Sequence, residues 1–476
     1  MMMTAVRFLY TATVFVLGAL SISKADTPKN PNYIFISIDD LGYADIGPFG
    51  SQLNRTPHLN RMAKEGRRLT SFYAAPVCSP SRAALMTGSY PKRALPIPGV
   101  LFPAYDHGLS PDEVTIAEVL KTKGYATAII GKWHLGDQPE LLPRRQGFDY
   151  WFGLPYSNDM GPVEDGIKSS LGQPLRKVRS GKKQQPPLPL MRNETVLKRV
   201  LPDDQQAIVE LYTNEAVRFL RENKDRHFFL YLPHSAVHFP IYPGKKFAGQ
   251  SPNGIYSDWV EELDWSVGRV LDTVRELGLD RKTFVIFTSD NGGTRRGLNT
   301  PLRGHKGSTW EGGMRVPTIA WWPGTIPSGT STGAITGMID ILPTFAKLAG
   351  AELPANRKLD GVDIWPHIVG KVDAAPAHDV FYYFRGLKLQ AVRKGHWKLH
   401  LAKKQLFHLI KDIGETNDVS AVNPDLVKAL LAVAQEMDSD LGLEGKGPGC
   451  RPLGRVKNPL PLINPDGTIR KGFESK

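Results

Sequence analysis

A cysteine and an arginine lie four residues apart in the string CSPSRAALMTG, which runs from Cys78 to Gly88. If Ser79 caps a helix whose first residue is Pro80, Cys78 lies at the positive end of that helix and Arg82 faces it one turn later. Such a site would hold an anion beside a reactive side chain. The simpler alternative is that Cys78 is a small buried apolar residue and that Ser79 and Pro80 only begin a helix.

Two short apolar runs, each typical of a buried strand, are followed directly by side chains that offer oxygen atoms. These side chains are Asp39, Asp40, Asp290 and Asn291. In open α/β sheets, ligands bind at the carboxyl ends of strands, and hard oxygen donors select Ca²⁺ or Mg²⁺. Each pair could instead cap a helix or stabilise a turn. Because the pattern occurs twice, we expect a metal site.

A second candidate pair, Lys132 and His134, lies in the string GKWHLG after another strand-like segment. If this string stays extended, both side chains project to the same side. Lysine then supplies a fixed positive charge, and histidine supplies a proton acceptor near neutral pH.

The elements that must position these residues alternate along the chain, which predicts an α/β fold with a mainly parallel sheet. The expected helices are 115–123, 205–223 and 258–277, and the expected strands are 33–38, 126–130, 228–232 and 284–289. Short strands at 380–384, 389–393 and 397–400, with a helix at 424–441, predict a smaller α+β domain. The expected divisions are a signal peptide 1–25, a catalytic domain 26–373, the small domain 374–444 and a tail 445–476.

Composition fits an ordinary globular protein, since the 476 residues are 41% hydrophobic and 22% charged. The formal charge of +13 would steer anions, polyanionic chains included, toward the protein, although solvated surface lysines give the same balance. A basic, proline-rich stretch at residues 171–192 predicts a surface loop that is either a solvated insertion or the rim of a substrate cleft. No nucleic-acid-binding signature occurs, so nucleic acid is not an expected partner.

The N-terminal residues predict export. Arg7, an apolar run over residues 8–20 and small residues before position 26 are typical of a cleaved signal peptide, and the run is shorter than the ~20 residues that a membrane span needs. We therefore expect no stable membrane insertion. If Cys78 is modified, Cys450 has no disulfide partner, and a large exported enzyme without disulfides fits a bacterial periplasm or cell surface.

The strings around Cys78 and Lys132 resemble the two signatures of the sulfatase family, closest in detail to the arylsulfatase A and N-acetylgalactosamine-6-sulfatase group. The first signature is Cys-x-Pro-x-Arg-x-x-x-x-Thr-Gly. The resemblance extends from Asn32 to about Ala421. It implies an alkaline-phosphatase-like fold, in which helices flank a large mixed β-sheet and the smaller C-terminal α+β domain carries a short antiparallel sheet.

The resemblance also implies roles for individual residues. Cys78 would be oxidised to formylglycine by a formylglycine-generating enzyme, and Ca²⁺, in preference to Mg²⁺, would be bound there. The implied metal ligands are Asp39, Asp40, Cys78, Asp290 and Asn291; the implied catalytic residues are Cys78, Arg82, Lys132, His134, His238 and Lys306; and the implied substrate-binding residues are Lys132, Ser157, His238 and Lys306. His238 is preferred to His234 because it directly precedes the Phe-Pro pair of the family's His-aromatic-Pro segment.

The reaction implied by this resemblance is hydrolysis of a sulfate ester, with a sulfated carbohydrate, or otherwise an aryl sulfate, as substrate and with exo action. The hydrate of formylglycine would attack sulfur, His238 would give a proton to the leaving alcohol, and His134 would accept a proton when sulfate is expelled. Two alternatives stay open: a phosphate or phosphonate ester hydrolase of the same superfamily, and an inactive relative that binds sulfated glycans.

Overall fold

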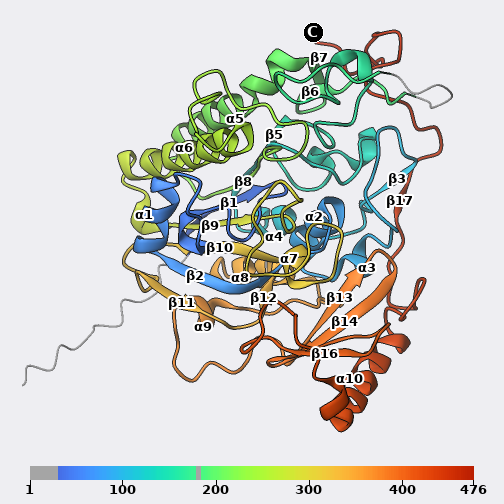
Figure 1. Cartoon of the computed structure of the whole chain (residues 1–476). Helices are drawn as coiled ribbons and strands as arrows, with labels where there is room; N and C mark the ends of the chain where they lie inside the picture. The colour runs from blue at the N-terminus through green and yellow to red at the C-terminus, as the bar shows by residue number, and fades with distance from the viewer. Residues whose placement is uncertain (1–29, 178–183, 476) are drawn as a thin grey trace, which may run out of the picture.

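A large mixed sheet forms the centre of the molecule (Figure 1). The computed structural model describes residues 30–177 and 184–475, so the predicted signal peptide, residues 1–25, lies outside the described residues. Within the described residues, eleven strands join in the order β11-β2-β10-β9-β1-β8-β4-β5-β6-β7, and β12 pairs with β2. None of the helices in the described ranges is long and apolar enough to cross a membrane.

The strands of this sheet are β1 Asn32–Ile38, β2 Arg67–Tyr73, β4 Ala126–Ile130, β5 Tyr150–Gly153, β6 Pro189–Arg192, β7 Thr195–Arg199, β8 Phe228–Pro233, β9 Thr283–Ser289, β10 Arg315–Trp321, β11 Thr330–Thr332 and β12 Thr336–Gly337. The neighbours β9, β1, β8 and β4 run parallel to one another. By contrast, β10 is antiparallel to β9 and β2, and β6 is antiparallel to β5 and β7. The basic stretch 171–192 therefore ends in a strand, β6.

Buried apolar side chains cover both faces of the sheet. Because successive side chains of a strand point to opposite faces, Tyr33 and Phe35 of β1 enter one cluster, whereas Ile34, Ile36 and Ile38 enter the other. Burial on both faces explains why the central strands read as continuous apolar runs in the sequence.

Helices cover the two faces. The first cluster includes side chains of α2, α4 and α8, and the second includes those of α1, α5 and α6. The expected helices at 115–123, 205–223 and 258–277 are found as α4, α5 and α6 with shifted ends. The helices are α1 Pro57–Glu65, α2 Cys78–Thr87, α3 Pro91–Ala94, α4 Ile116–Lys121, α5 Pro202–Glu222, α6 Ile255–Glu276, α7 Glu311–Met314, α8 Ile341–Leu348, α9 Trp365–Ile368 and α10 Pro424–Glu436.

A separate antiparallel sheet follows near the C-terminus of the described chain. It consists of β13 Val380–Arg385, β14 Lys388–Lys394, β15 Trp397–His400 and β16 Gln405–His408, and α10 lies beside it (Figure 1). Its buried side chains continue the first apolar cluster of the large sheet. The tail then returns to the large body, where β17 Gly454–Arg455 pairs with β3 His107–Gly108. The predicted helix 424–441 ends earlier, at Glu436.

Candidate active site

The carboxyl ends of four neighbouring parallel strands deliver most of the candidate residues to one edge of the sheet. Asp39 and Asp40 follow β1, and Asp290 and Asn291 follow β9. Since Ile38 of β1 is in register with Ser289 of β9, the two acidic segments emerge side by side. The segment that carries Lys132 follows β4, and the segment that carries His238 follows β8.

Four oxygen-bearing side chains come together there and are buried: Asp39, Asp40, Asp290 and Asn291. One carboxylate oxygen from each aspartate lies within 4.8 Å of the other two. The amide of Asn291 donates to Asp40 Oδ1 at 2.8 Å. Among the described residues, Asp39 Oδ1 and Asn291 Oδ1 have no hydrogen-bond partner. Because buried polar atoms are normally paired, these two oxygens suit a cation, and the set is a candidate acidic metal site.

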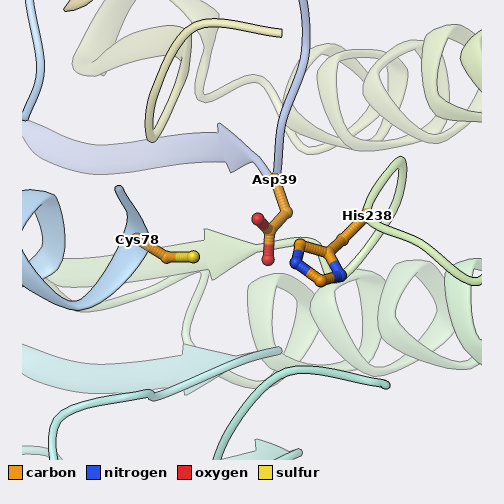
Figure 2. A group of neighbouring side chains, drawn as sticks. All are labelled: Asp39, Cys78 and His238. Carbon is orange, nitrogen blue, oxygen red and sulfur yellow. The ribbon is translucent and has the colours of Figure 1, made fainter. Parts of the chain in front are cut away.

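Cys78 is the first residue of α2 and points toward this cluster. Figure 2 shows its Sγ directed at the carboxylate of Asp39, with the ring of His238 on the other side of Asp39; the three ligand atoms lie within 4.8 Å of one another. The expected Ser79 cap is wrong. Val77 is the N-terminal flanking residue, and the Ser79 hydroxyl instead accepts from the backbone N–H of Leu101 at 3.2 Å.

The thiol of Cys78 is poorly suited to act by itself as a nucleophile. Burial raises its pKa to about 11, and the nearby positive charges of Lys132 and Lys306 only partly oppose this effect. The thiolate is the reactive form of cysteine, so the unmodified residue is protonated and unreactive near neutral pH. Cys78 and Cys450 are both free of disulfides.

Arg82 is fully buried on α2 and is held by several contacts. Its Nε and Nη2 donate to Asp290 Oδ2 at 3.1 and 2.7 Å, and its Nη1 donates to the backbone carbonyl of Lys132 at 2.6 Å. Asp39 Oδ2 lies 3.6 Å from Nη2. A planar guanidinium suits such a forked contact, and here it links α2 to the ends of β9, β1 and β4.

Two lysines lie against the acidic cluster. Lys132 Nζ donates to Asp39 Oδ2 at 2.5 Å and to Ser157 Oγ at 2.8 Å, and all three side chains are buried. Lys306 Nζ lies 2.6 Å from Asp40 Oδ1. Burial alone would raise the pKa of Asp39, but the positive charges of Lys132, His238 and Arg82 outweigh burial and hold this pKa far below its usual range. Asp39 is therefore ionised at neutral pH.

His134 does not continue an extended strand, so this expectation is wrong: its φ of 62° places it in the left-handed region. Its Nε2 lies 2.9 Å from the carbonyl oxygen of Leu101, which can only accept, so Nε2 carries a hydrogen. Nδ1 has no partner among the described residues. Burial, with the charges of Lys132 and Arg82, lowers the pKa of His134 well below its ordinary value. The ring is therefore neutral, and Nδ1 is a free proton acceptor.

His238 lies on the opposite side of the cluster, with its side chain 12% exposed. Its Nδ1 donates to the carbonyl of Phe239 at 2.6 Å, and its Nε2 lies 3.8 Å from Asp40 Oδ2. His234, the other histidine of this segment, is buried, and its Nε2 lies 3.2 Å from Ser266 Oγ. The structure thus brings His238 into the cluster and leaves His234 in the core.

Sequence reasoning missed Asp45, which fixes the loops around the cluster. Its carboxylate accepts from the backbone N–H of Gly42 at 2.6 Å and of Leu298 at 2.8 Å, and from Tyr256 Oη at 2.6 Å. These bonds tie the loop after β1 to the loop after β9 and to α6. The only sequence signal was an aspartate three residues after Gly42, a common turn pattern.

A buried ionic network between the large body and the small sheet was also missed. Lys398 of β15 donates to the carbonyl of Thr309 and to Glu311 Oε1, both at 2.8 Å, and lies 3.0 Å from Glu415 Oε1. Glu415 Oε2 accepts from the backbone N–H of Glu311 at 2.7 Å. The small sheet therefore anchors the loop that carries Lys306.

The cluster combines three buried or nearly buried cations, Arg82, Lys132 and Lys306, with three aspartates. In formal charge these groups balance. A divalent cation at the aspartates would leave the site positive overall, which suits an anionic substrate next to residue 78. The arrangement can therefore hold an anion, place a nucleophile beside it and offer histidines on two sides.

Comparisons with known proteins give the same assignment. The sulfatase family model matches residues 31–351, more than half of the chain. The chain is 37% identical over 415 residues to N-acetylgalactosamine-6-sulfatase of Rattus norvegicus, covering 81% of this chain and 74% of the relative. It is 41% identical over 389 residues to arylsulfatase A of Homo sapiens, and the match covers 78% of this chain and 75% of that relative.

The fold also matches solved sulfatase structures. The crystal structure of Ps i-CgsB in complex with k-i-k-neocarrahexaose superposes with a TM-score of 0.73 at 31% identity, covering 86% of this chain and 92% of that one. The large mixed sheet with flanking helices and the separate small antiparallel sheet are the alkaline-phosphatase-like architecture of these enzymes. Sulfatases are typically dependent on formylglycine and a metal, and this chain holds a candidate acidic metal site. The chain belongs to the sulfatase family and is a sulfuric ester hydrolase.

Proposed function

We propose that this protein removes sulfate from sulfated carbohydrates, by exo action, after Cys78 has been oxidised to formylglycine by a formylglycine-generating enzyme. Ca²⁺ would be held by Asp39, Asp40, Asp290 and Asn291 together with residue 78. The observation that carries the proposal is the meeting of Cys78, Asp39 and His238 within 4.8 Å, at a buried acidic cluster that cations surround.

The donor atoms support this metal. They are carboxylate and amide oxygens, and two of them, Asp39 Oδ1 and Asn291 Oδ1, have no protein partner in the described chain. Flexible oxygen-rich sites suit Ca²⁺, whereas Mg²⁺ demands a stricter octahedron and keeps several waters. The ion and the hydrated aldehyde would together supply a hydroxyl nucleophile that is usable at neutral pH.

The remaining steps belong to residues of this chain. Lys132 and Lys306 would bind the sulfate oxygens and stabilise the charge that develops on them. Since Nδ1 of His238 is occupied by the Phe239 carbonyl, Nε2 is the atom that would give a proton to the leaving alcohol. The neutral His134 would accept a proton at Nδ1 during release of sulfate. Ser157 would orient Lys132 as well as contact substrate.

The catalytic role that the family resemblance implies for Arg82 fits positioning better than direct contact with the sulfate. Its Nε, Nη1 and Nη2 all donate to Asp290 or to the Lys132 carbonyl. Three of the five N–H donors of the guanidinium are therefore used within the protein. We infer that Arg82 aligns the metal-binding edge with the sulfate-binding edge of the site.

A carbohydrate substrate is supported by the matched proteins and by charge. One relative is named for a sulfated amino sugar, and one solved structure contains neocarrahexaose. The +13 charge would attract polyanionic chains. The burial of Cys78 supports exo action. Because this residue is only 2% exposed, a sugar at the end of a chain would reach it more readily than a sugar within the chain. A carbohydrate of this kind also fits our proposal that the protein is exported, to a bacterial periplasm or the cell exterior.

The test compares three proteins produced together with a formylglycine-generating enzyme: the wild type, Cys78→Ala and Cys450→Ala. Mass spectrometry of the peptide with residue 78 should show a sulfur-free aldehyde or its hydrate in the wild type and in the matched control Cys450→Ala. Both should release sulfate from sulfated sugars, measured by ion chromatography. Sulfate release by Cys78→Ala at the wild-type rate would contradict the proposal. Release of phosphate from the corresponding sugar phosphates, without sulfate release from the sulfated sugars, would favour a phosphoesterase.

A further inference from the structure

A cavity of about 410 Å³ is lined by Phe239, the residue that follows His238. Figure 2 places His238 on the side of Asp39 away from Cys78, which is where the leaving alcohol of a sulfate ester would lie. The lining residues that matter here are Lys168, Arg176, Phe239, Tyr256 and Arg296. A volume of this size is in the range of small-molecule sites.

The lining of the cavity concentrates positive charge. The guanidinium carbons of Arg176 and Arg296 both lie 5.0 Å from the ring centroid of Phe239. Both arginines are exposed, and among the described residues neither has a carboxylate within salt-bridge distance. Lys168 adds a third cation, with its Nζ 2.9 Å from Gln185 Oε1. None of the described lining residues is acidic.

This arrangement is incomplete without an anion. Like charges held against one aromatic ring repel each other. Burial lowers the pKa of Lys168; the charge of Asp159 opposes this effect, and the charge of Arg176 adds to it by a smaller amount. The planar fork of arginine matches carboxylate and sulfate groups in bidentate geometry, and the ring of Phe239 fixes both forks in place. An anionic group between the arginines would remove the repulsion.

The cavity is also tied directly to the catalytic residues. Phe239 follows His238, and its carbonyl holds the His238 ring by the Nδ1 hydrogen bond. Arg296 lies in the loop after Asn291. Tyr256 donates to Asp45, the residue that joins that loop to the loop after β1. A group bound in the cavity would therefore belong to the same substrate whose sulfate is cleaved.

We propose that this cavity, which we call the second-anion pocket, binds a further anionic group of the substrate, a carboxylate or a second sulfate, on the sugar beside the scissile ester. Arg176 and Arg296 recognise the anion, and Phe239 forms the floor that orients them. This inference rests on the proposed function. It narrows the substrate class from sulfated carbohydrates in general to those with two anionic groups close together.

The experiment uses three disaccharides that share one sulfate ester and differ only in the neighbouring sugar, which carries a hydroxyl, a carboxylate or a second sulfate. For the mature wild type, kcat/KM for one or both of the doubly anionic substrates should exceed that for the neutral neighbour by about 10- to 100-fold, the range for charge-assisted hydrogen bonds. The preferred anion identifies the group. In the double variant Arg176→Gln/Arg296→Gln, the ratio of kcat/KM values between the doubly anionic and the neutral-neighbour substrates should fall to about threefold or less. The cause should be a higher KM for the doubly anionic substrate.

The control is Arg295→Gln, which removes the same charge from an adjacent exposed arginine outside the lining of the cavity and should keep the wild-type preference. Binding is measured separately by calorimetry in Cys78→Ala, with and without the two arginine substitutions. Turnover without an arginine-dependent preference would overturn the pocket and leave the proposed function standing. Arginine-dependent binding with no sulfate release from any substrate would overturn the proposed function and support the pocket. Equal binding and equal turnover of all three disaccharides by the wild type would overturn the pocket.

Discussion

Replacing Lys132 with methionine tests the charge balance of the active site. Methionine keeps an unbranched side chain of similar length, so the change removes a charge with little change in packing. In the wild type, Lys132 Nζ lies 2.5 Å from Asp39 Oδ2, and both side chains are fully buried. Without the lysine, Asp39 keeps Arg82 as its nearest arginine, with Nη2 at 3.6 Å.

Removing one partner of a buried ion pair costs about 3–5 kcal/mol, because the other charge stays buried without compensation. Since Arg82 still compensates part of the Asp39 charge, we expect the lower end, about 3 kcal/mol of unfolding free energy, when a chelator is present. Saturating Ca²⁺ should reduce this cost, because the ion neutralises the same carboxylate and binds only the folded state. Activity should fall by about 10²- to 10³-fold, the usual effect of losing one group that stabilises transition-state charge.

The assay is urea unfolding in EDTA and in Ca²⁺, followed by sulfate release under the same calcium conditions. The matched control is Lys121→Met, which breaks the exposed pair between Lys121 Nζ and Asp149 Oδ1 at 2.8 Å. Surface pairs contribute about 0–1 kcal/mol, so this control should unfold almost like the wild type, with or without Ca²⁺. The reasoning is refuted if the two variants lose equal stability in EDTA, or if Ca²⁺ leaves the cost of Lys132→Met unchanged.

Two further predictions concern groups outside the catalytic cluster. Lys398→Met should cost about 3 kcal/mol of unfolding free energy and slow sulfate release, because it frees the Thr309 carbonyl and removes a cation from the buried Glu311 and Glu415. The lower end of the range is expected because Glu311 keeps Arg315 at 3.3 Å; adding Glu415→Gln should restore part of the stability in urea unfolding. Burial raises the pKa of Glu262 to about 8. The folded state therefore keeps a proton that the unfolded state releases near pH 4.3, its ordinary pKa. The free energy of unfolding should fall as pH rises from about 4.3 to about 8. Glu262→Gln should flatten that fall between pH 5 and pH 8.5, and an unchanged slope would contradict the assignment.

The strand-end part of the site could be predicted because it is local in the sequence. Asp39 and Asp290 each follow a continuous apolar run, and such runs form buried strands whose ends face one edge of a sheet. The sequence shows no direct sign that these two strands are neighbours. Their pairing, with Ile38 opposite Ser289, joins segments about 250 residues apart and depends on packing over the whole sheet.

Two local details of the structure differ from the sequence-based expectation because tertiary contacts outweigh local conformational preference. Ser79 looks like a helix cap, but its hydroxyl accepts from the distant backbone N–H of Leu101, and the helix begins at Cys78, two residues before the expected Pro80. Leu101 also accepts from His134, whose left-handed backbone no simple strand pattern predicts. One loop residue thus places both the start of the helix that bears Cys78 and the tautomer of His134.

The second-anion pocket shows why a charge-rich stretch could not be assigned from the sequence. The basic segment 171–192 reads equally as a solvated insertion or as a cleft rim, because charge alone does not reveal its neighbours. The decisive contact is that of Arg176 with Phe239, which also meets Arg296 from the loop after β9. Three segments that are far apart in the sequence therefore form one anion-binding surface. Its alignment with His238 follows from the Phe239 backbone, so substrate selection and proton transfer share a single residue as their support.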